Sequence, residues 1–403
     1  MTATPTLTIC VPSRNRQYTF KETIRSLVIS PRMDIQFVFA DNSDDPAIMD
    51  AFMKDILGDP RVTYLRSAER VYPMNENWER CIDAATGDFI CVIGDDDYVD
   101  PDVADVLADL CANEKDVDVF VWNRLAYNWP DNRDIARQVA VPLLTSVAEV
   151  RREHLFEEFF SWKVHGATPQ CPFSIYHGAV SRRVMQANKA RFGGKHFGHL
   201  TVDFETSCKL LVNAKRFFHC QRAFSVLGAC FASNSGTVGK PDEAKRRYAA
   251  IMAELGRNPA DDRYMIDFPF HGALGVAAAV AQVQEWFCVT FGVQRPHGWE
   301  ENFAKACAID CGRASSESAY NMMVDAYREA FRKWRGGLYM KFFKPKYKPH
   351  SKNGHFLGIN AGYLYVEETI GGVTTPADLY HLTSQVMVPV SEITYGKTKR
   401  QVA

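Results

Sequence analysis

The chain has 403 residues, enough for one large domain with an appendage or for two domains, and 46% of them are hydrophobic, as in ordinary globular proteins. The 47 lysines and arginines nearly balance 48 acidic residues, so the net charge of -1 gives no overall attraction to nucleic acid. The eleven cysteines form no CxxC pair and lie mostly in apolar segments. They predict buried, reduced thiols rather than a disulfide framework or a zinc site.

Targeting signals are not evident. The first residues, MTATPTLTICVPSRNR, lack a basic stretch followed by an apolar core, so no secretory signal is predicted. The segment nearest to a membrane span is 273–293, but Gln282, Gln284 and Glu285 interrupt it, which favours a buried helix. Together with the reduced thiols, these features predict a cytoplasmic protein.

The first 125 residues alternate the patterns of strands and helices. Thr19, with Glu22 three residues later, predicts a capping box that opens a helix through Leu27. Apolar strands without polar alternation, separated by helices, predict a parallel sheet covered on both faces. The expected strands are 7–11, 35–40, 62–65, 89–93 and 117–122, and the expected helices are 19–27, 49–57, 75–85 and 101–110.

The pattern becomes less regular from about residue 126. A helix is predicted at 151–162, and a glycine-bearing loop then leads into a helical segment within 200–211. Two strands are expected at 216–220 and 223–231. From about residue 243 onward, helical patterns dominate.

Polar clusters follow three of the expected strands. PSRNR (12–16), DNSDD (41–45) and GDDD (94–97) each begin where an apolar run ends. In parallel sheets, ligands bind outside the carboxyl ends of the strands. The three clusters are therefore predicted to meet at one edge of the sheet.

Four aspartates stand close together in GDDDYVDPD. Asp100, followed by Pro101, is predicted to cap a helix, which leaves Asp95–Asp97 unexplained. Neighbouring carboxylates raise one another's pKa unless a cation compensates, and Mg2+ or Mn2+ takes oxygen ligands of this kind. A calcium loop fits poorly, because its twelfth position would be Val106 rather than glutamate. The triplet predicts a metal-plus-phosphate site, and a solvated acidic loop is the alternative.

The other two clusters offer contacts for a phosphorylated ligand. Arg14 and Arg16 are suited to phosphates, although loop arginines are often only solvated. Asp41 ends the second strand, where its carboxylate can accept hydrogen bonds from a ribose or a base edge. An Asx-turn at the strand end is the alternative for Asp41.

These motifs together resemble a known family. CVPSRNR, FADNSDD and NENWERCIDAATGDFICVIGDDDYVDPD are similar, in order and spacing, to the N-terminal half of the family 2 glycosyltransferases of the GT-A fold, in a subgroup with a GDDD motif. The resemblance covers about residues 6–125, is thin to about 235 and is absent beyond. It implies a GT-A fold, a Rossmann-like, mostly parallel sheet flanked by helices, here with a mainly helical C-terminal extension.

The resemblance also implies roles for individual residues. Counted back from Pro101, Asp96 matches the metal-binding aspartate, Asp95 a ribose or metal contact, and Asp97 a more variable neighbouring position. The glycine commonly found before Asn77 is absent, which leaves the shape of that loop open. The implied nucleotide-sugar contacts are Pro12, Arg14, Asn15, Arg16, Asp41, Asn77 and Asp95, and the implied ligands of Mn2+ or Mg2+ are Asp96, Asp97 and Asp95.

A transferase of this type needs a general base for the acceptor hydroxyl. Asp203 resembles the aspartate that opens the acceptor-side helix in the family, and capping of that helix is its alternative role. His199 and Glu205 are substitutes for the base. Residues 234–239, which carry glycine after the last expected core strand, are a further candidate for closing over the donor; an ordinary loop is the alternative.

The resemblance and the element pattern predict three regions. Residues 1–125 would form the nucleotide-sugar-binding half of the GT-A domain, 126–242 its acceptor-binding half, and 243–403 a helical C-terminal region. Within the last, segment 327–352 interleaves basic and aromatic residues. It could contact an anionic membrane or an anionic glycan, or be an ordinary helix face with snorkelling cations.

The resulting prediction is a metal-dependent, inverting glycosyltransferase of polysaccharide biosynthesis. It would move a sugar from a nucleotide diphosphate sugar to a hydroxyl of a glycan or glycolipid acceptor, in the cytoplasm or peripherally at the inner face of the membrane, without binding nucleic acid. A nucleotidyl- or phosphotransferase is disfavoured by the lack of a GxxxxGK loop. A non-catalytic binding module is disfavoured because Asp95–Asp97 and Asp203 would keep clustered charge without a use.

Overall fold

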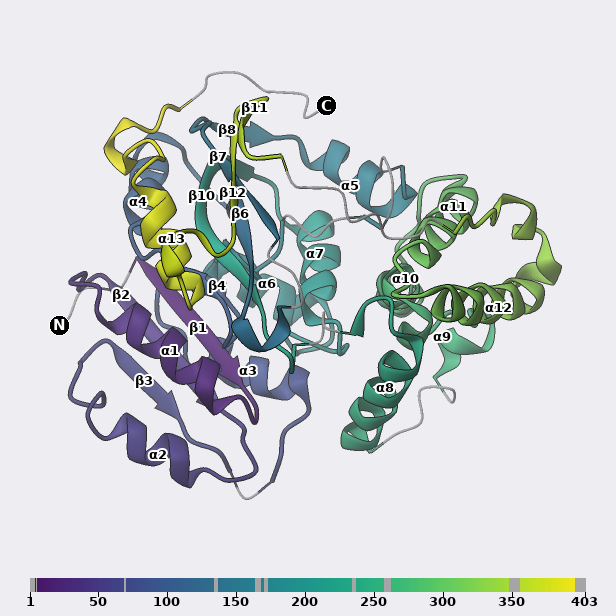
Figure 1. Cartoon of the computed structure of the whole chain (residues 1–403), viewed down its shortest axis with the longest axis horizontal. Helices are drawn as coiled ribbons and strands as arrows, with labels where there is room; N and C mark the ends of the chain where they lie inside the picture. The colour runs from purple at the N-terminus through teal and green to yellow at the C-terminus, as the bar shows by residue number, and fades with distance from the viewer. Residues whose placement is uncertain are drawn as a thin grey trace.

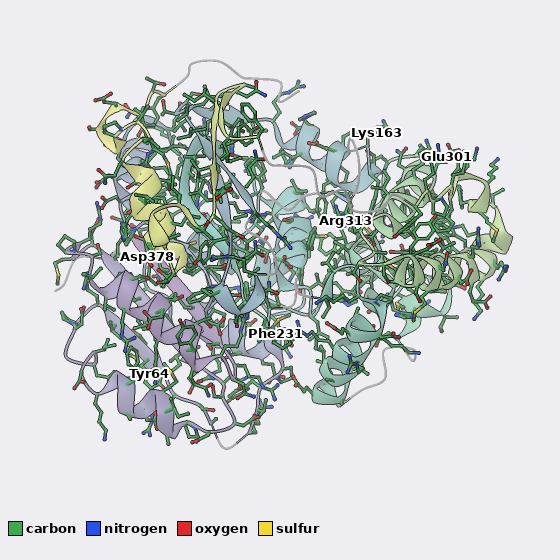
Figure 2. The ribbon with its side chains drawn as sticks, in the orientation of Figure 1. Tyr64, Lys163, Phe231, Glu301, Arg313 and Asp378 are labelled. Atoms are coloured by element: carbon green, nitrogen blue, oxygen red, sulfur yellow. The ribbon has the colours of Figure 1, made fainter. Side chains whose placement is uncertain are left out.

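The computed structural model describes residues 4, 6–68, 70–133, 137–163, 168–169, 173–233, 237–256, 262–347 and 356–395. A twisted sheet with helices on both faces forms one part of the molecule, and a group of helices lies beside it (Figure 1). Figure 2 shows Asp378, near the start of the last helix, over the sheet and Glu301 in the helical group at the opposite end. The helical region thus flanks one side of the sheet.

The main sheet has nine strands in the order β3-β2-β1-β4-β9-β6-β10-β5, with β8 paired to β10. Strands β1 to β4 are parallel to their neighbours in this set, as are β6 and β10. Strand β9 runs antiparallel between β4 and β6, and β5 and β8 run antiparallel to β10. The prediction of a mostly parallel sheet flanked by helices is confirmed. The strands are β1 (Leu7–Ser13), β2 (Ile35–Asp41), β3 (Val62–Leu65), β4 (Phe89–Val92), β5 (Tyr98–Val99), β6 (Val119–Asn128), β8 (Val147–Val150), β9 (Gly178–Ser181) and β10 (Phe217–Ala229).

Helices cover both faces because successive strand residues point to opposite sides. Leu7, Ile9 and Val11 of β1 pack in the core under α1, α2, α4 and α13, whereas Cys10 packs in the core under α3, α5, α6 and α7. These helices are α1 (Gln17–Val28), α2 (Ala47–Met53), α3 (Met74–Ala84), α4 (Val103–Asn113), α5 (Arg152–Ser161), α6 (Arg182–Arg191), α7 (Val202–Asn213) and α13 (Pro376–Ser384).

The helical region has a core of its own. Aromatic rings of Phe270, Phe303, Phe331 and Trp334 pack there with centroids 4.8–6.1 Å apart. None of the described helices is long and apolar enough to cross a membrane. The elements are α8 (Pro241–Leu255), α9 (Arg263–Ile266), η4 (Gly272–Leu274), α10 (Val276–Phe291), α11 (Trp299–Cys311), α12 (Glu317–Lys333), η5 (Trp334–Gly337) and η6 (Met340–Phe342).

The end of the described chain returns to the sheet instead of continuing the helical region. Strands β11 (Gly358–Asn360) and β12 (Tyr363–Glu367) form a small sheet with β7 (Gln138–Pro142), and α13 packs against β10 and β5. In Figure 1 this yellow segment lies beside α1 and α4. Residues 356–395 therefore differ from the helical region expected for 243–403. The remaining short elements are η1 (Pro130–Asn132), η7 (Ile370–Gly372) and η8 (Val390–Glu392).

Two predicted helix starts are wrong. Helix α1 begins at Gln17, because Asn15 takes a left-handed turn (φ 55°) directly after β1; Thr19 then lies inside the helix and its hydroxyl donates to the Arg16 carbonyl at 3.1 Å. The helix expected at Pro101 begins at Val103. Its predicted cap, Asp100, instead accepts the backbone N–H of residue 102 at 3.0 Å in an Asx-turn.

Strand β10 joins the two strands that the sequence separated. The expected segments 216–220 and 223–231 form one strand with irregular pairing to β6 between Cys220 and Ser225. Arg222, whose polar character interrupted the apolar pattern, lies in this irregularity and is nevertheless buried. A bulge therefore lets the strand continue through a charged residue.

Candidate functional site

The ends of β1 and β4 meet through an ion pair between a half-buried arginine and a buried aspartate. Arg16 contacts Asp95 twice, with Nη2–Oδ1 at 2.6 Å and Nε–Oδ2 at 3.1 Å, and the Ser13 hydroxyl donates to the same carboxylate. Burial raises the pKa of Asp95 to about 7, with Arg16 opposing this rise and Asp96 adding to it. The predicted neighbours Arg16 and Asp95 are thus brought together, and Asp95 is fully enclosed.

Asp96 differs from its neighbours because it faces a cavity. Its side chain lines the cavity together with Pro12 and Arg16, whose Nη1 lies 3.4 Å from Asp96 Oδ2. The same oxygen accepts the Ser233 hydroxyl and the Cys230 N–H. In the described part of the chain, Asp96 is the only aspartate of the triplet that lines this cavity.

Asp97 is turned into the fold and its carboxylate is fully used. Oδ2 accepts the Gly94 N–H and the Tyr176 hydroxyl at 2.7 Å each and lies 2.9 Å from His177 Nε2, while Oδ1 accepts the Gly228 N–H at 2.7 Å. Burial alone would raise the pKa of Asp97, but His177 and these hydrogen bonds hold it below its ordinary value. The prediction of Asp97 as a metal ligand is therefore revised: its oxygens connect strands of the sheet.

Asp41 combines a turn with an unsatisfied oxygen. Its Oδ1 accepts the N–H and the hydroxyl of Ser43, which is the Asx-turn expected as an alternative. Its Oδ2 is buried and has no hydrogen-bond partner in the described chain, and burial raises the pKa of this carboxyl group. Asn77 lies beside it and donates weakly to the carbonyls of Ser13 and Ala40 at 3.4 Å each. An unpartnered acceptor thus remains at the carboxyl end of β2, but Asp41 is fully buried and does not line the cavity.

Arg14 and Asn15 do not line the cavity. Arg14 forms ion pairs with Glu254 of α8 at 2.6 Å and Asp44 at 3.5 Å, and Asn15 exchanges hydrogen bonds with Asp44. Of the predicted nucleotide contacts, these two therefore connect the loop after β1 with the loop after β2 and, through Arg14, with α8.

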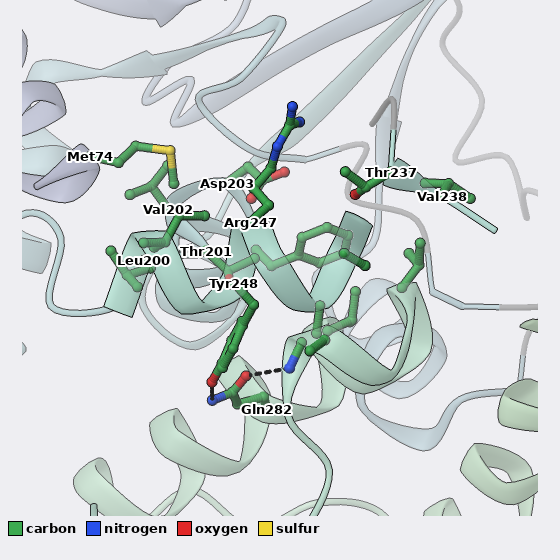
Figure 3. A pocket seen from close by; sticks show the side chains of 18 of the residues that line it. Met74, Leu200, Thr201, Val202, Asp203, Thr237, Val238, Arg247, Tyr248 and Gln282 are labelled. Carbon is green, nitrogen blue, oxygen red and sulfur yellow. Dashed lines mark hydrogen bonds between the residues drawn. The ribbon is translucent and has the colours of Figure 1, made fainter. Parts of the chain in front are cut away.

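The cavity has a volume of about 640 Å³ and extends from the strand ends to the helical region. Figure 3 shows Asp203 and Arg247 on one side of it and the pair Tyr248 and Gln282 on another. Its size is typical of pockets that bind small molecules. One continuous cavity therefore connects Asp96 at the sheet edge with Asp203 at the start of α7.

Asp203 is the acidic side chain that α7 presents to this cavity. It lies in the first turn of α7 with Thr201 at the N-cap, and burial raises its pKa. Glu205 is instead fully buried, where it pairs with Lys209 at 2.6 Å and accepts the N–H groups of Gly198 and His199. Glu205 thus holds the loop before α7, and Asp203 is the acid in the first turn of α7 that lines the cavity.

His199 also lines the cavity. Its Nδ1 accepts the Thr201 N–H at 3.1 Å, and its ring lies 5.3 Å from that of Trp286. Of the candidate closing segment 234–239, residues 234–236 lie outside the described part of the chain, and 237–239 line the cavity.

A second acidic group lies away from the cavity. Glu79, Asp83 and His196 bring potential metal-ligating atoms within 4.8 Å of one another. The ammonium of Lys189, however, lies 2.7 Å from Asp83 and 3.3 Å from Glu79. An internal cation therefore already balances these carboxylates.

Several residues of the site were not predicted from the sequence. Ser233 and Arg247 come from the loop and helix after β10, and Tyr176 and His177 precede β9. No local motif marks them. The need for glycine at position 228 is evident only from the structure, because a Cβ there would lie 1.7 Å from the Asp96 carbonyl oxygen.

Comparisons with known proteins identify the class. Residues 8–184 match the family described as Glycosyl transferase family 2. This match spans the N-terminal part of the chain, less than half of its length, and indicates a glycosyltransferase domain there. The mostly parallel sheet flanked by helices agrees with the GT-A fold expected for it.

Solved structures of S. aureus TarS are similar over much of the chain. TarS 1–349 in complex with UDP-GlcNAc has 12% identity and a TM-score of 0.43, covering 88% of this chain and 99% of that chain. The structure titled TarS has 13% identity and a TM-score of 0.42, covering 90% and 60%, respectively. The complex of TarS 1–349 with UDP has 13% identity and a TM-score of 0.41, covering 88% and 94%. No curated protein matches the sequence.

Proposed function

We propose that this glycosyltransferase uses a nucleotide diphosphate sugar and a divalent metal and transfers the sugar, with inversion, to a hydroxyl of a saccharide acceptor. The observation that carries the proposal is the placement of Asp96 and Asp203 on one cavity, from two different elements of the domain. Such a direct displacement needs one carboxylate that binds the metal and a second that acts as the general base.

The donor is assigned to the edge where β1, β2 and β4 end. Arg16 supplies positive charge at the cavity, suited to a diphosphate. The unpartnered Oδ2 of Asp41 is suited to accept a hydrogen bond from a nucleoside. Pro12 also lines the cavity, while Asn77 bonds the Ser13 carbonyl and Asp95 pairs with Arg16.

The metal is assigned to Asp96. Its carboxylate offers a hard oxygen ligand at the cavity, which fits Mn2+ or Mg2+ sharing its coordination with substrate phosphates. When bound, such an ion supplies positive charge that stabilises the leaving diphosphate. Asp95, engaged with Arg16, is a neighbouring support, and Asp97 is left out because its oxygens are occupied.

Asp203 is assigned the role of general base. Its raised pKa increases the basicity of the carboxylate, which aids removal of the acceptor proton. In an inverting displacement the acceptor oxygen attacks as the nucleotide diphosphate departs from the opposite side. Asp203 receives the acceptor proton in that step.

We also propose that the basic segment 327–352 contacts an anionic membrane. The structure describes residues 327–347 of this segment. Arg332 and Lys333 are exposed but pair with Glu329, and Leu338 is 57% exposed between η5 and η6. A cytoplasmic location is likewise retained, and it is supported by the free thiols of the described cysteines.

Binding and transfer test this function separately. We expect Mn2+-dependent binding of a nucleoside diphosphate, found by screening UDP, GDP and TDP, that Asp96→Asn abolishes and Asp109→Asn, an exposed aspartate on α4, leaves intact. Asp203→Asn should keep nucleotide binding and lose release of nucleoside diphosphate from the sugar donors in the presence of candidate glycans. Absence of any nucleotide binding would refute the proposal, and transfer of a nucleotidyl group would support the phosphotransferase alternative.

A further inference from the structure

The cavity continues past Asp203 into a part that the donor does not explain. Helix α8 forms one wall of this part, and the segment from η4 into α10 forms the other. The face of α8 that lines the cavity repeats with helical spacing and is half-buried, whereas the residues between are exposed. The lining residues of this face are Ala244, Arg247, Tyr248, Ile251, Met252 and Leu255.

The opposite wall is also apolar. Leu274, Val276, Ala279 and Val280 line the cavity from η4 and α10. Helix α8 has no fully buried residue. It touches this wall through Tyr248, which bonds Gln282 and packs on His271, and its other apolar residues line the cavity. We refer to this part of the cavity, between Ile251, Met252 and Leu255 on one side and Leu274, Ala279 and Val280 on the other, as the apolar chamber.

Two polar side chains that line this part of the cavity, Gln282 and Asp310, are already engaged in internal hydrogen bonds. Gln282 accepts the Gly272 N–H at 2.9 Å and donates to the Tyr248 hydroxyl at 3.2 Å, as Figure 3 shows. Asp310 accepts the Ala277 N–H at 3.1 Å and the Tyr327 hydroxyl at 2.9 Å. A ligand in the chamber would therefore bind through apolar surface, because a hydroxyl-rich sugar would lose hydration there without compensation.

The mouth of the chamber has the opposite character. Arg247 donates to the Ser233 carbonyl, next to the hydroxyl that contacts Asp96, and Asp203 lies beside it in Figure 3. The charged mouth suits the reacting sugar, and the apolar chamber suits what is attached to it. Resting on the proposed glycosyltransferase function, we propose that the acceptor is amphipathic: its accepting sugar lies at Asp203 and carries an apolar group, which the chamber binds.

The apolar group could be an alkyl chain or an aromatic ring, and binding experiments separate the two. Calorimetry with methyl, butyl and octyl β-glucosides, below the concentration at which octyl glucoside forms micelles, measures the alkyl contribution; phenyl β-glucoside measures the aromatic one. Burial of each methylene is expected to tighten binding roughly fourfold over the first few carbons. Gain with the phenyl but not the alkyl compounds would assign an aromatic group, and an affinity independent of both would overturn the proposal.

Two substitutions on the same helix locate the effect. Ala244→Phe places a large side chain in the cavity, whereas Ala250→Phe places it on the exposed face of α8. We expect the first to reduce the gain from methyl to octyl glucoside at least tenfold and the second to leave it unchanged. Equal effects of both variants would contradict binding in the chamber.

Nucleotide binding distinguishes the two proposals. Both variants should retain the Mn2+-dependent binding of the nucleoside diphosphate, which also shows that they are folded. If nucleotide binds but chain length has no effect, the chamber proposal fails and the donor proposal stands. If chain length matters but no nucleotide binds, the donor proposal fails, and the chamber remains an apolar binding site without the assigned acceptor role.

Discussion

Tyr380 connects the end of the described chain to the acidic loop, and its hydroxyl group offers a sharp test. The hydroxyl donates to Asp100 Oδ2 at 2.6 Å, 280 positions earlier in the chain, and accepts from Arg222 Nη1 at 2.9 Å. Tyr380 and Arg222 are 1% and 4% exposed, so water has little access to the hydroxyl, whereas Asp100 is partly exposed. Tyr380→Phe removes only the oxygen and keeps the ring in place.

The expected loss follows from the charges involved. A hydrogen bond to a charged group contributes about 1.5–3 kcal/mol, and two are lost. Asp100 retains the N–H of residue 102, and Arg222 retains the carbonyls of Ala223 and Val388, so part of the cost is avoided. We expect Tyr380→Phe to lower the free energy of unfolding by about 2–4 kcal/mol.

Urea unfolding of the full chain measures this loss, with Tyr395→Phe as the matched control. The Tyr395 hydroxyl makes one long contact, 3.4 Å to the Val106 carbonyl, and its side chain is 38% exposed, so an effect within about 0.5 kcal/mol is expected. A double-mutant cycle with Asp100→Asn should give a coupling of about 1 kcal/mol or more. Equal stability of the two Phe variants, or no coupling, would refute the reasoning.

Three further outcomes follow from the site. Asp203 must be ionised to act as a base, and burial raises its pKa. The rate of transfer at saturating donor should therefore fall as the pH drops through a range above the ordinary aspartate pKa of about 3.9. A rate that falls only below that value would contradict the assignment. Because the pKa of Asp203 is higher in the folded than in the unfolded chain, ionised Asp203 lowers stability as the pH rises from the unfolded-state pKa through the folded-state pKa. Asp203→Asn should therefore raise the melting temperature at neutral pH. An unchanged or lower melting temperature would argue against burial of this charge. Gly228→Ala should prevent stable folding or displace Asp96, because its Cβ would lie 1.7 Å from the Asp96 carbonyl oxygen, whereas Gly58→Ala has open space and should leave thermal stability and nucleotide binding unchanged.

The sequence predicted the convergence of the polar clusters because that convergence is a property of parallel strands. Once β1, β2 and β4 were recognised as apolar runs, their carboxyl ends had to meet at one edge. The contacts of Arg16 with Asp95, and of Asn77 with the end of β2, follow from that geometry. Local patterns sufficed here because each strand carries its own functional residues directly after it.

The different environments of the three aspartates in GDDD could not be predicted from the sequence. Asp97 is distinguished from Asp96 by partners at positions 176, 177 and 228, which lie 79 to 131 residues away in the chain. Strand β9 runs antiparallel between β4 and β6, and this insertion places Tyr176 and His177 under the acidic loop. Three chemically identical side chains thus acquire three different environments from their neighbours.

The same limit applies to the cavity wall, and it explains why the acceptor is harder to predict than the donor. The proposed donor contacts follow the strand ends of one sheet, so their spacing is constrained by the fold. The far wall comes from α8 and α10, whose apolar residues have the spacing of ordinary core helices. Only the open space between the two stripes separates a binding chamber from a packed core, and that space depends on tertiary packing. Acceptor specificity in this chain is therefore expected to change with substitutions on α8 that leave the metal-binding edge untouched.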